Sequence, residues 1–236
     1  MNKDPQIDMT IKFAFEKIVN NDQKTAKALV FYLDELFKNE FKMLQESEIN
    51  EKLDKVIQIF RYLLDKDVFE GYYKNSFAKR LLDARILNED AEKVLLLKLK
   101  EECGFAFTQR LEVMFKDIKM SEELTKEFQG SQCYNAIQPL EMNVKVLTTG
   151  HWPNDQREQQ PQIVNFSREL TTAINTFTQY YFSKFNSGRQ LHWKLSLGSA
   201  DLRSKLNSAQ RYEFQVSTYQ MCLLLLFNTH IELTYQ

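Results

Sequence analysis

The stretch Met142-Asn-Val-Lys-Val-Leu-Thr-Thr-Gly-His-Trp-Pro153 marks the point at which the hydrophobic pattern of the chain changes. Met142, Val144 and Val146 alternate with Asn143 and Lys145, so an extended segment here has one apolar side and one polar side. This period of two predicts a half-buried β-strand. The same alternation recurs at residues 191–197 and 212–217. The sequence therefore predicts a small antiparallel sheet in the second half of the chain.

Two helices are predicted beside these strands. The first has an apolar stripe that could cover the sheet, formed by Phe166, Leu170, Ala173, Ile174, Phe177 and Tyr181. The second begins after Ser217, because Ser217 and Gln220 have the spacing of a capping box, and it continues through Phe227. Residues 139–236 are therefore predicted to form an α/β domain.

The first half of the chain has a helical period instead. Apolar residues recur three and four positions apart, with charged residues between them. The stripes comprise Ala26, Leu29, Val30, Leu33, Leu36 and Phe37; Leu53, Val56, Ile57, Phe60, Leu63 and Leu64; Val68, Phe69, Tyr72, Tyr73, Phe77 and Leu81; and Leu111, Met114, Phe115 and Ile118. Asn88 is a predicted N-cap and Gly104 a predicted C-terminal stop. Residues 1–138 are therefore predicted to form a helical bundle, and the fold class is α+β, mainly helical.

Composition excludes several kinds of partner. The 236 residues carry 31 basic and 32 acidic side chains, and a net charge of −1 provides no field that would attract nucleic acid or an anionic membrane. No apolar run reaches the roughly 20 residues that span a bilayer, and the first residues lack the apolar core of a signal peptide. Three widely spaced cysteines favour a reducing intracellular compartment. We therefore expect a soluble, unexported protein that recognises its partners by shape.

No set of residues has the pattern of an active site or a metal site. His151 has no second histidine or acidic cluster at ligand spacing, and the cysteines form no C-x-x-C pair, so neither metal nor cofactor is expected. Lys79 and Arg80 form a basic spot, but nearby carboxylates such as Glu92 would cancel its potential. An enzyme is the least favoured interpretation, because no nucleophile, base and orienting group occur together.

Several ordered motifs together resemble the cullin family. Besides residues 142–153 they are Lys66-Asp-Val-Phe-Glu-Gly-Tyr-Tyr73, Ala78-Lys-Arg-Leu-Leu82, Ser187-Gly-Arg-Gln-Leu-His-Trp193, Leu197-Gly-Ser-Ala-Asp-Leu202 and Phe214-Gln-Val-Ser-Thr-Tyr-Gln-Met221. The resemblance covers nearly the whole chain. It implies a non-catalytic scaffold of a ubiquitin ligase, in the cytoplasm and nucleus, that holds a RING-finger protein and, through it, a ubiquitin-conjugating enzyme near a bound substrate.

The resemblance also implies parts that this sequence does not contain. In cullins, substrate adaptors bind N-terminal helical repeats, and a lysine in a later winged helix is modified by a ubiquitin-like protein. We expect this chain to stop at the start of that winged helix, as an excised domain or a shortened gene product. The competing hypothesis is a free-standing helical module that regulates such ligases by competing for the RING subunit.

The predicted sheet is the candidate binding site, because strand edges leave N–H and C=O groups free to pair with another chain. The resemblance implies that the N-terminal strand of the RING protein joins this sheet. The expected contact residues are Met142, Val144, Val146, Leu147, Leu191, Trp193 and Leu195. Burial in the core of the protein would also explain the apolar sides of these segments, but we favour the interface role.

Overall fold

The computed structural model describes residues 5–22, 24–83, 88–153, 166–185, 188–207 and 210–234. Contacts within the chain group it into two units. The first comprises Met1–Glu122 and Lys145–Asn154, and the second comprises Glu123–Val144 and Asp155–Gln236. The division at residues 138 and 139 that the sequence suggests stays a prediction. Each unit is described separately below.

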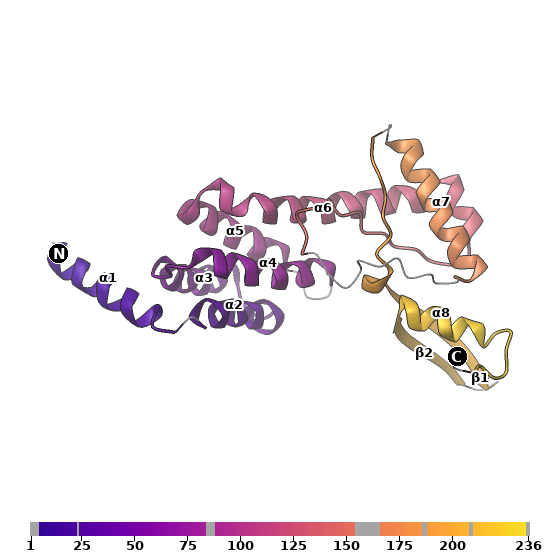
Figure 1. The fold of residues 1–236 in the computed structure, drawn as a ribbon, viewed down its shortest axis with the longest axis horizontal. Helices are drawn as coiled ribbons and strands as arrows, with labels where there is room; N and C mark the ends of the chain where they lie inside the picture. Colours follow the sequence, from indigo (N-terminus) through magenta and orange to yellow (C-terminus); the bar gives the residue numbers. More distant parts are fainter. Residues whose placement is uncertain are drawn as a thin grey trace. The chain divides into compact units, whose positions relative to one another are not determined.

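The first unit is helical (Figure 1). Its elements are α1 (Pro5–Val19), α2 (Thr25–Glu35), the π-helical turn η1 (Leu36–Glu40), α3 (Glu46–Arg61), α4 (Lys66–Leu82), α5 (Glu89–Cys103) and most of α6 (Phe105–Gln129). Helix α2 contacts α3 and α4, and α3 contacts α5. The apolar stripes of these helices meet in one core that includes Leu33, Phe60, Phe77 and Trp152.

Local signals set several helix boundaries. The side chain of Asn88 accepts a hydrogen bond from the backbone N–H of Ala91, which confirms the predicted N-cap of α5. The same helix ends at Gly104, whose φ of 81° places it in the left-handed region that glycine adopts most easily. Gln45 and Glu48 form a capping box at the start of α3. Each of these helix boundaries depends on residues within one helical turn, so the sequence alone can predict it.

Three residues of the predicted stripes lie outside the core. Leu64 is 72% exposed because α3 ends at Arg61, so the helical period no longer applies to it. Val68 and Tyr72 are exposed as well. Phe69, Tyr73 and Phe77 bury the face of α4, and each of the two exposed residues precedes a buried one, about 100° around the helix. The stripe on α4 is therefore narrower than the sequence suggests.

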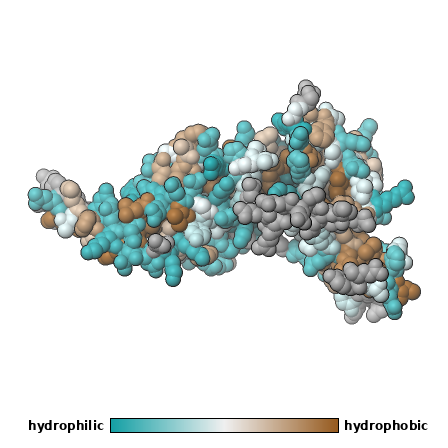
Figure 2. Space-filling model, viewed as in Figure 1, coloured by the Kyte–Doolittle hydropathy of each residue, from teal (hydrophilic) through white to brown (hydrophobic). Residues whose placement is uncertain are grey.

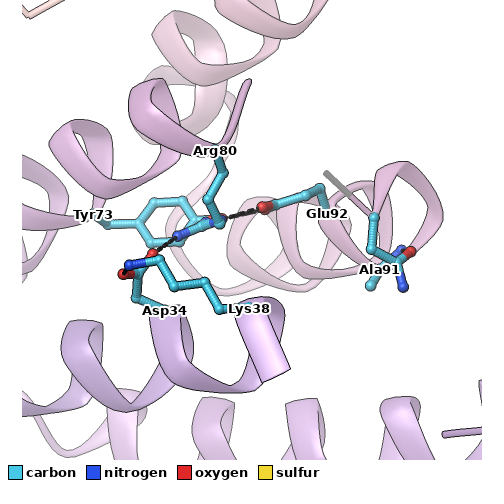
Figure 3. A network of polar contacts seen from close by, with 7 residues as sticks. Asp34, Lys38, Tyr73, Arg80, Ala91 and Glu92 are labelled. Carbon is cyan, nitrogen blue, oxygen red and sulfur yellow. Dashed lines mark hydrogen bonds and ion pairs between the residues drawn. The ribbon is translucent and has the colours of Figure 1, made fainter. Parts of the chain in front are cut away.

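A network of charged side chains is buried in this core (Figure 3). Arg80, which is 1% exposed, donates through Nε to Oε1 of Glu92 at 2.6 Å and through Nη1 to Oδ1 of Asp34 at 2.8 Å. The hydroxyl of Tyr73 donates to Oε2 of Glu92 at 2.9 Å, and the guanidinium of Arg80 lies 4.5 Å from the centre of the Phe37 ring. The network joins α2, α4 and α5.

The second unit contains a helical part and a hairpin. The end of α6, the 3-10 turn η2 (Gln132–Ile137) and α7 (Arg168–Lys184) share an aromatic cluster centred on Phe128 and Phe177, whose rings lie edge to face with centroids 5.2 Å apart. The short turn η4 (Leu195–Leu197) precedes an antiparallel pair of strands, β1 (Ser199–Asn207) and β2 (Gln210–Ser217), and helix α8 (Thr218–Leu226) follows. The capping box of Ser217 and Gln220 opens α8 as predicted.

Helix α8 is apolar around most of its circumference, and much of it faces outward. Figure 2 shows hydrophobic surface gathered over it. The exposed side chains include Leu223, Leu224, Leu226 and Phe227.

The predicted sheet is only partly correct. The strand at residues 212–217 is confirmed as part of β2, and its register pairs Leu202 with Phe214 and Ser199 with Ser217. Residues 142–147 and 191–194 are not strands, because no ladder of backbone hydrogen bonds joins them to another strand among the described residues, and Leu195 lies in η4. The partner of β2 is β1, which the sequence analysis did not predict. Helix α7, which was expected to cover the sheet, packs mainly against η2 among the described elements.

Gly198, between η4 and β1, is expected to tolerate no side chain. A Cβ atom there would overlap the hydroxyl of Thr218, which is buried, while the N–H of Thr218 donates to the carbonyl oxygen of Gly198 at 3.1 Å. Gly198→Ala should therefore lower the free energy of unfolding of the second unit by about 1–3 kcal/mol. Urea denaturation followed by Trp193 fluorescence, in a Trp152→Phe background, measures this change.

Gly71 provides the matched control. It lies in the interior of α4, and a Cβ atom added there would meet no atom within 4 Å. Gly71→Ala should stabilise the first unit by up to about 1 kcal/mol, since alanine favours the helix more than glycine. Equal effects of the two substitutions would contradict the steric argument at Gly198.

Candidate partner-binding site

In the second unit, the first part of the extended segment 142–148 is bound by side chains of α6. The hydroxyl Oγ1 of Thr125 donates to the carbonyl oxygen of Val144 at 2.9 Å and accepts from the N–H of the same residue at 3.4 Å. Nε2 of Gln129 donates to the carbonyl oxygen of Met142 at 3.3 Å, and the N–H of Met142 donates to the hydroxyl of Tyr134 at 3.3 Å. Side chains thus satisfy the backbone of residues 142 and 144.

In the first unit, α6 binds the rest of the segment in the same way. Oγ of Ser121 accepts from the N–H of Val146 at 2.8 Å and lies 3.0 Å from its carbonyl oxygen. The buried carboxylate of Asp117 accepts three hydrogen bonds: from the N–H and the hydroxyl of Thr148 at 2.7 and 2.8 Å, and from Nε1 of Trp152 at 2.8 Å. Asp117 therefore fixes the end of the segment and the turn that follows it.

Lys145 attaches the same segment to α4. Its Nζ donates to the carbonyl oxygens of Leu81 and Leu82 at 3.3 and 2.5 Å. These carbonyls belong to the last turn of α4, where a cation meets the negative end of the helix dipole. Burial lowers the pKa of Lys145 from its ordinary value.

The other edge of the segment is open among the described residues. In an extended chain, the N–H and C=O of one residue point to one edge, and those of the next residue point to the opposite edge. The bonds from α6 go to residues 142, 144, 146 and 148. The backbone groups of Asn143, Lys145 and Leu147 have no hydrogen-bond partner in the described part of the chain. This edge has the properties of an unpaired strand.

The predicted site residues fall into two groups. Met142, Val144, Val146 and Leu147 are half-buried on the segment just described. Leu191, Trp193 and Leu195 are half-buried in the second unit, where Trp193 packs edge to face against Phe177 and donates from Nε1 to the hydroxyl of Thr178 at 3.3 Å. Trp193 is thus held by α7.

The described residues contain no group of three histidine, cysteine or carboxylate side chains that could hold a metal ion. No helix in the described ranges has both the length and the apolar character needed to cross a bilayer. Burial raises the pKa of the thiols of Cys103 and Cys222, which disfavours their reactive thiolate forms. The open edge at Asn143, Lys145 and Leu147 is the candidate site for binding a partner.

Comparison with known proteins agrees with this architecture. A family model described as the cullin alpha solenoid domain matches residues 1–125, and one described as the cullin alpha+beta domain matches residues 146–236. The chain belongs to the cullin family. The resemblance noted in the sequence motifs is thereby confirmed.

Individual cullins match along almost the whole chain. Cullin-3 of Dictyostelium discoideum is 39% identical over 234 residues, which cover 99% of this chain and 30% of that protein. Cullin-3A of Arabidopsis thaliana is 38% identical over 94% of this chain and 30% of that protein. Cullin-4A of Homo sapiens is 37% identical over 92% of this chain and 28% of that protein. The chain thus spans less than a third of the length of these curated relatives.

Sequence reasoning located the extended segment of this cullin chain but missed the residues that hold it. Asp117, Ser121, Thr125 and Gln129 are spaced four apart, so they lie along one face of α6. Ser121 is 2% exposed and Asp117 8% exposed, which is unusual for polar side chains. Polar residues at every fourth position of an otherwise amphipathic helix are the sequence signal that could have identified the face of α6 that holds the extended segment.

Proposed function

We propose that this chain is a non-catalytic part of a cullin-RING ubiquitin ligase scaffold and that it recruits the RING subunit by accepting one of its strands along residues 142–148. Family membership supports the scaffold role. The observation that carries the binding mode is the open edge at Asn143, Lys145 and Leu147. An added strand would satisfy these backbone groups and extend the half-buried apolar side formed by Met142, Val144 and Val146.

The scaffold would act through proximity. A RING subunit held on this chain brings its ubiquitin-conjugating enzyme close to a substrate that is bound elsewhere on the same complex. Holding donor and acceptor together raises their effective concentration without changing the chemistry of transfer. On this proposal the chain holds its partner, and the conjugating enzyme performs the transfer chemistry.

Charged substitutions on the apolar side of the segment are expected to abolish RING binding. Val144→Asp or Val146→Asp places a carboxylate where the added strand should bury apolar side chains, and desolvating this charge opposes binding. Calorimetric titration of the chain with a RING-finger protein of the cullin-binding class should give a tight complex for the wild type and none for either variant.

Met43→Asp is the matched control, because the same kind of change occurs at a side chain that is 89% exposed. It should leave affinity unchanged, and circular dichroism should show the same helicity in all variants. Wild-type affinity in Val144→Asp would exclude strand addition at this segment. Failure of the wild-type chain to bind any RING protein would overturn the proposed function itself.

A further inference from the structure

We infer that α6 takes the place of a β-strand beside residues 142–148, so that a partner strand can add only along the edge of Asn143, Lys145 and Leu147. The first argument is spacing. Four residues of an α-helix rise about 6 Å, and two residues of an extended chain advance about 6.6 Å. Helix side chains at every fourth position can therefore meet every second residue of an extended segment.

The contacts follow this rule along both elements. In the second unit, Gln129 meets Met142 and Thr125 meets Val144. In the first unit, Ser121 meets Val146 and Asp117 meets Thr148. The helix numbers fall by four as the segment numbers rise by two, as in an antiparallel pair. Four helical residues turn about 40° beyond one full turn, so such a row stays in reach for only a few steps.

The hydroxyl groups of Thr125 and Ser121 can also form the hydrogen bonds that a neighbouring β-strand would form. In a hydrogen-bonded pair of an antiparallel sheet, one residue both donates to and accepts from its neighbour. A hydroxyl has one donor and two acceptor positions, so it can do the same for a single backbone residue. Thr125 does so for Val144. The Ser121 hydroxyl lies within reach of two carbonyl oxygens, those of Val146 and Asp117, which share its one proton.

The contacts with α6 determine which edge of residues 142–148 a partner strand can use and what kind of peptide can bind there. Val144 already has both backbone bonds, and at Val146 the N–H is bonded and the carbonyl oxygen shares the Ser121 proton, so a second strand on this edge would find few groups to pair with. The open edge lies beside the half-buried side of Met142, Val144 and Val146. Neighbouring strands place side chains on common faces. The occupant is therefore an extended peptide with apolar residues at alternate positions, which on the proposed function is the strand of the RING subunit.

Residue-specific amide exchange, measured by NMR on the full chain without any partner, tests whether α6 occupies the edge formed by Val144 and Val146. The N–H groups of Val144 and Val146 should exchange slowly, and those of Asn143, Lys145 and Leu147 should exchange rapidly. Adding the RING-finger protein should protect the second set and leave the first set as it was. Rapid exchange at Val144 and Val146 in the free chain would overturn the inference.

Thr125 is the positioning residue to replace. Thr125→Val keeps the shape of the side chain and removes the hydroxyl, so the Val144 amide should lose its protection and RING affinity should fall roughly tenfold. Thr125→Ser should restore both. Thr172→Val is the control, because the Thr172 hydroxyl is exposed and donates only to the carbonyl oxygen of Arg168 in its own helix. If the role of Thr125 were purely structural, Thr125→Val would lower stability, but the Val144 amide protection and the RING affinity would not fall together.

The outcomes separate this inference from the proposed function. If the alternating exchange pattern is present but the wild-type chain binds no RING protein, the proposed function is wrong and the role of α6 stands. If the wild type binds and Thr125→Val binds equally well with the Val144 amide still protected, the role of α6 is wrong and the proposed function stands.

Discussion

Arg80→Met is expected to lower the free energy of unfolding of the first unit by about 3–5 kcal/mol, because it leaves the buried carboxylate of Glu92 without its charged partner. Arg80 and Glu92 are 1% and 0% exposed, so water cannot replace the lost ion pair. Burial alone would lower the pKa of Arg80, but the attraction of Glu92 outweighs it and raises this pKa. Arginine therefore stays charged throughout the accessible pH range.

The pH dependence of this variant has a definite sign. Burial raises the pKa of Glu92 even with Arg80 present, and Arg80 opposes this shift. Without Arg80, the pKa of Glu92 should rise further. A carboxyl whose pKa is higher in the folded state takes up its proton there first, so the folded state regains stability as the pH falls. The deficit of Arg80→Met relative to the wild type should therefore narrow between pH 7 and pH 5.

Two further variants give this prediction its controls. Lys38→Met removes the cation that pairs with the outer oxygen of Asp34, and Lys38 is 41% exposed, so the loss should stay within about 1 kcal/mol. The double variant Arg80→Met with Glu92→Leu removes both buried charges and should recover part of the stability. Urea denaturation followed by Trp152 fluorescence in a Trp193→Phe background measures all of them. A double variant less stable than Arg80→Met would contradict the explanation by an unpaired charge.

The sequence predicts those features that depend on near neighbours. The cap at Asn88, the stop at Gly104 and the capping box at Ser217 each involve residues within one turn of a helix, and all three are confirmed. The buried stripes of α2 and α3 follow from the same local period. For Arg80, sequence reasoning predicted cancellation by nearby carboxylates such as Glu92 but gave no sign that the pair is buried.

The extended segments show why the remainder was not predictable. Alternation at residues 142–147 indicates an extended chain with one half-buried side, and the structure has this. The alternation carries no information about which groups bond the backbone, and here side chains of α6 do so from 13 to 31 positions earlier in the sequence. Strand β1 was missed because Ser204 interrupts the alternation that Ala200 and Leu202 begin.

Asp117 is the second residue whose loss should have a large effect. Asp117→Ala removes the acceptor of three hydrogen bonds. It leaves Nε1 of the buried Trp152 without a partner, while the exposed Thr148 loses two bonds that fix its position. The buried indole donor costs roughly 1–3 kcal/mol and the lost Thr148 bonds up to about 1 kcal/mol each, so the free energy of unfolding of the first unit should fall by about 2–5 kcal/mol. Trp152 itself reports the change, because its fluorescence depends on the packing that this carboxylate maintains.

Asp117→Asn distinguishes lost bonds from lost charge. Oδ2 accepts from both N–H groups, whereas Oδ1 accepts from the Thr148 hydroxyl, which can reverse its role and accept from an amide. The asparagine variant can thus keep three bonds and lose only their charge assistance, so its deficit should be about 1 kcal/mol. Asp54→Ala, which removes an exposed partner of Lys98, should cost no more than that. If asparagine were as damaging as alanine, the charge of Asp117 would be what holds the end of the extended segment, and the number of donors it satisfies would not matter.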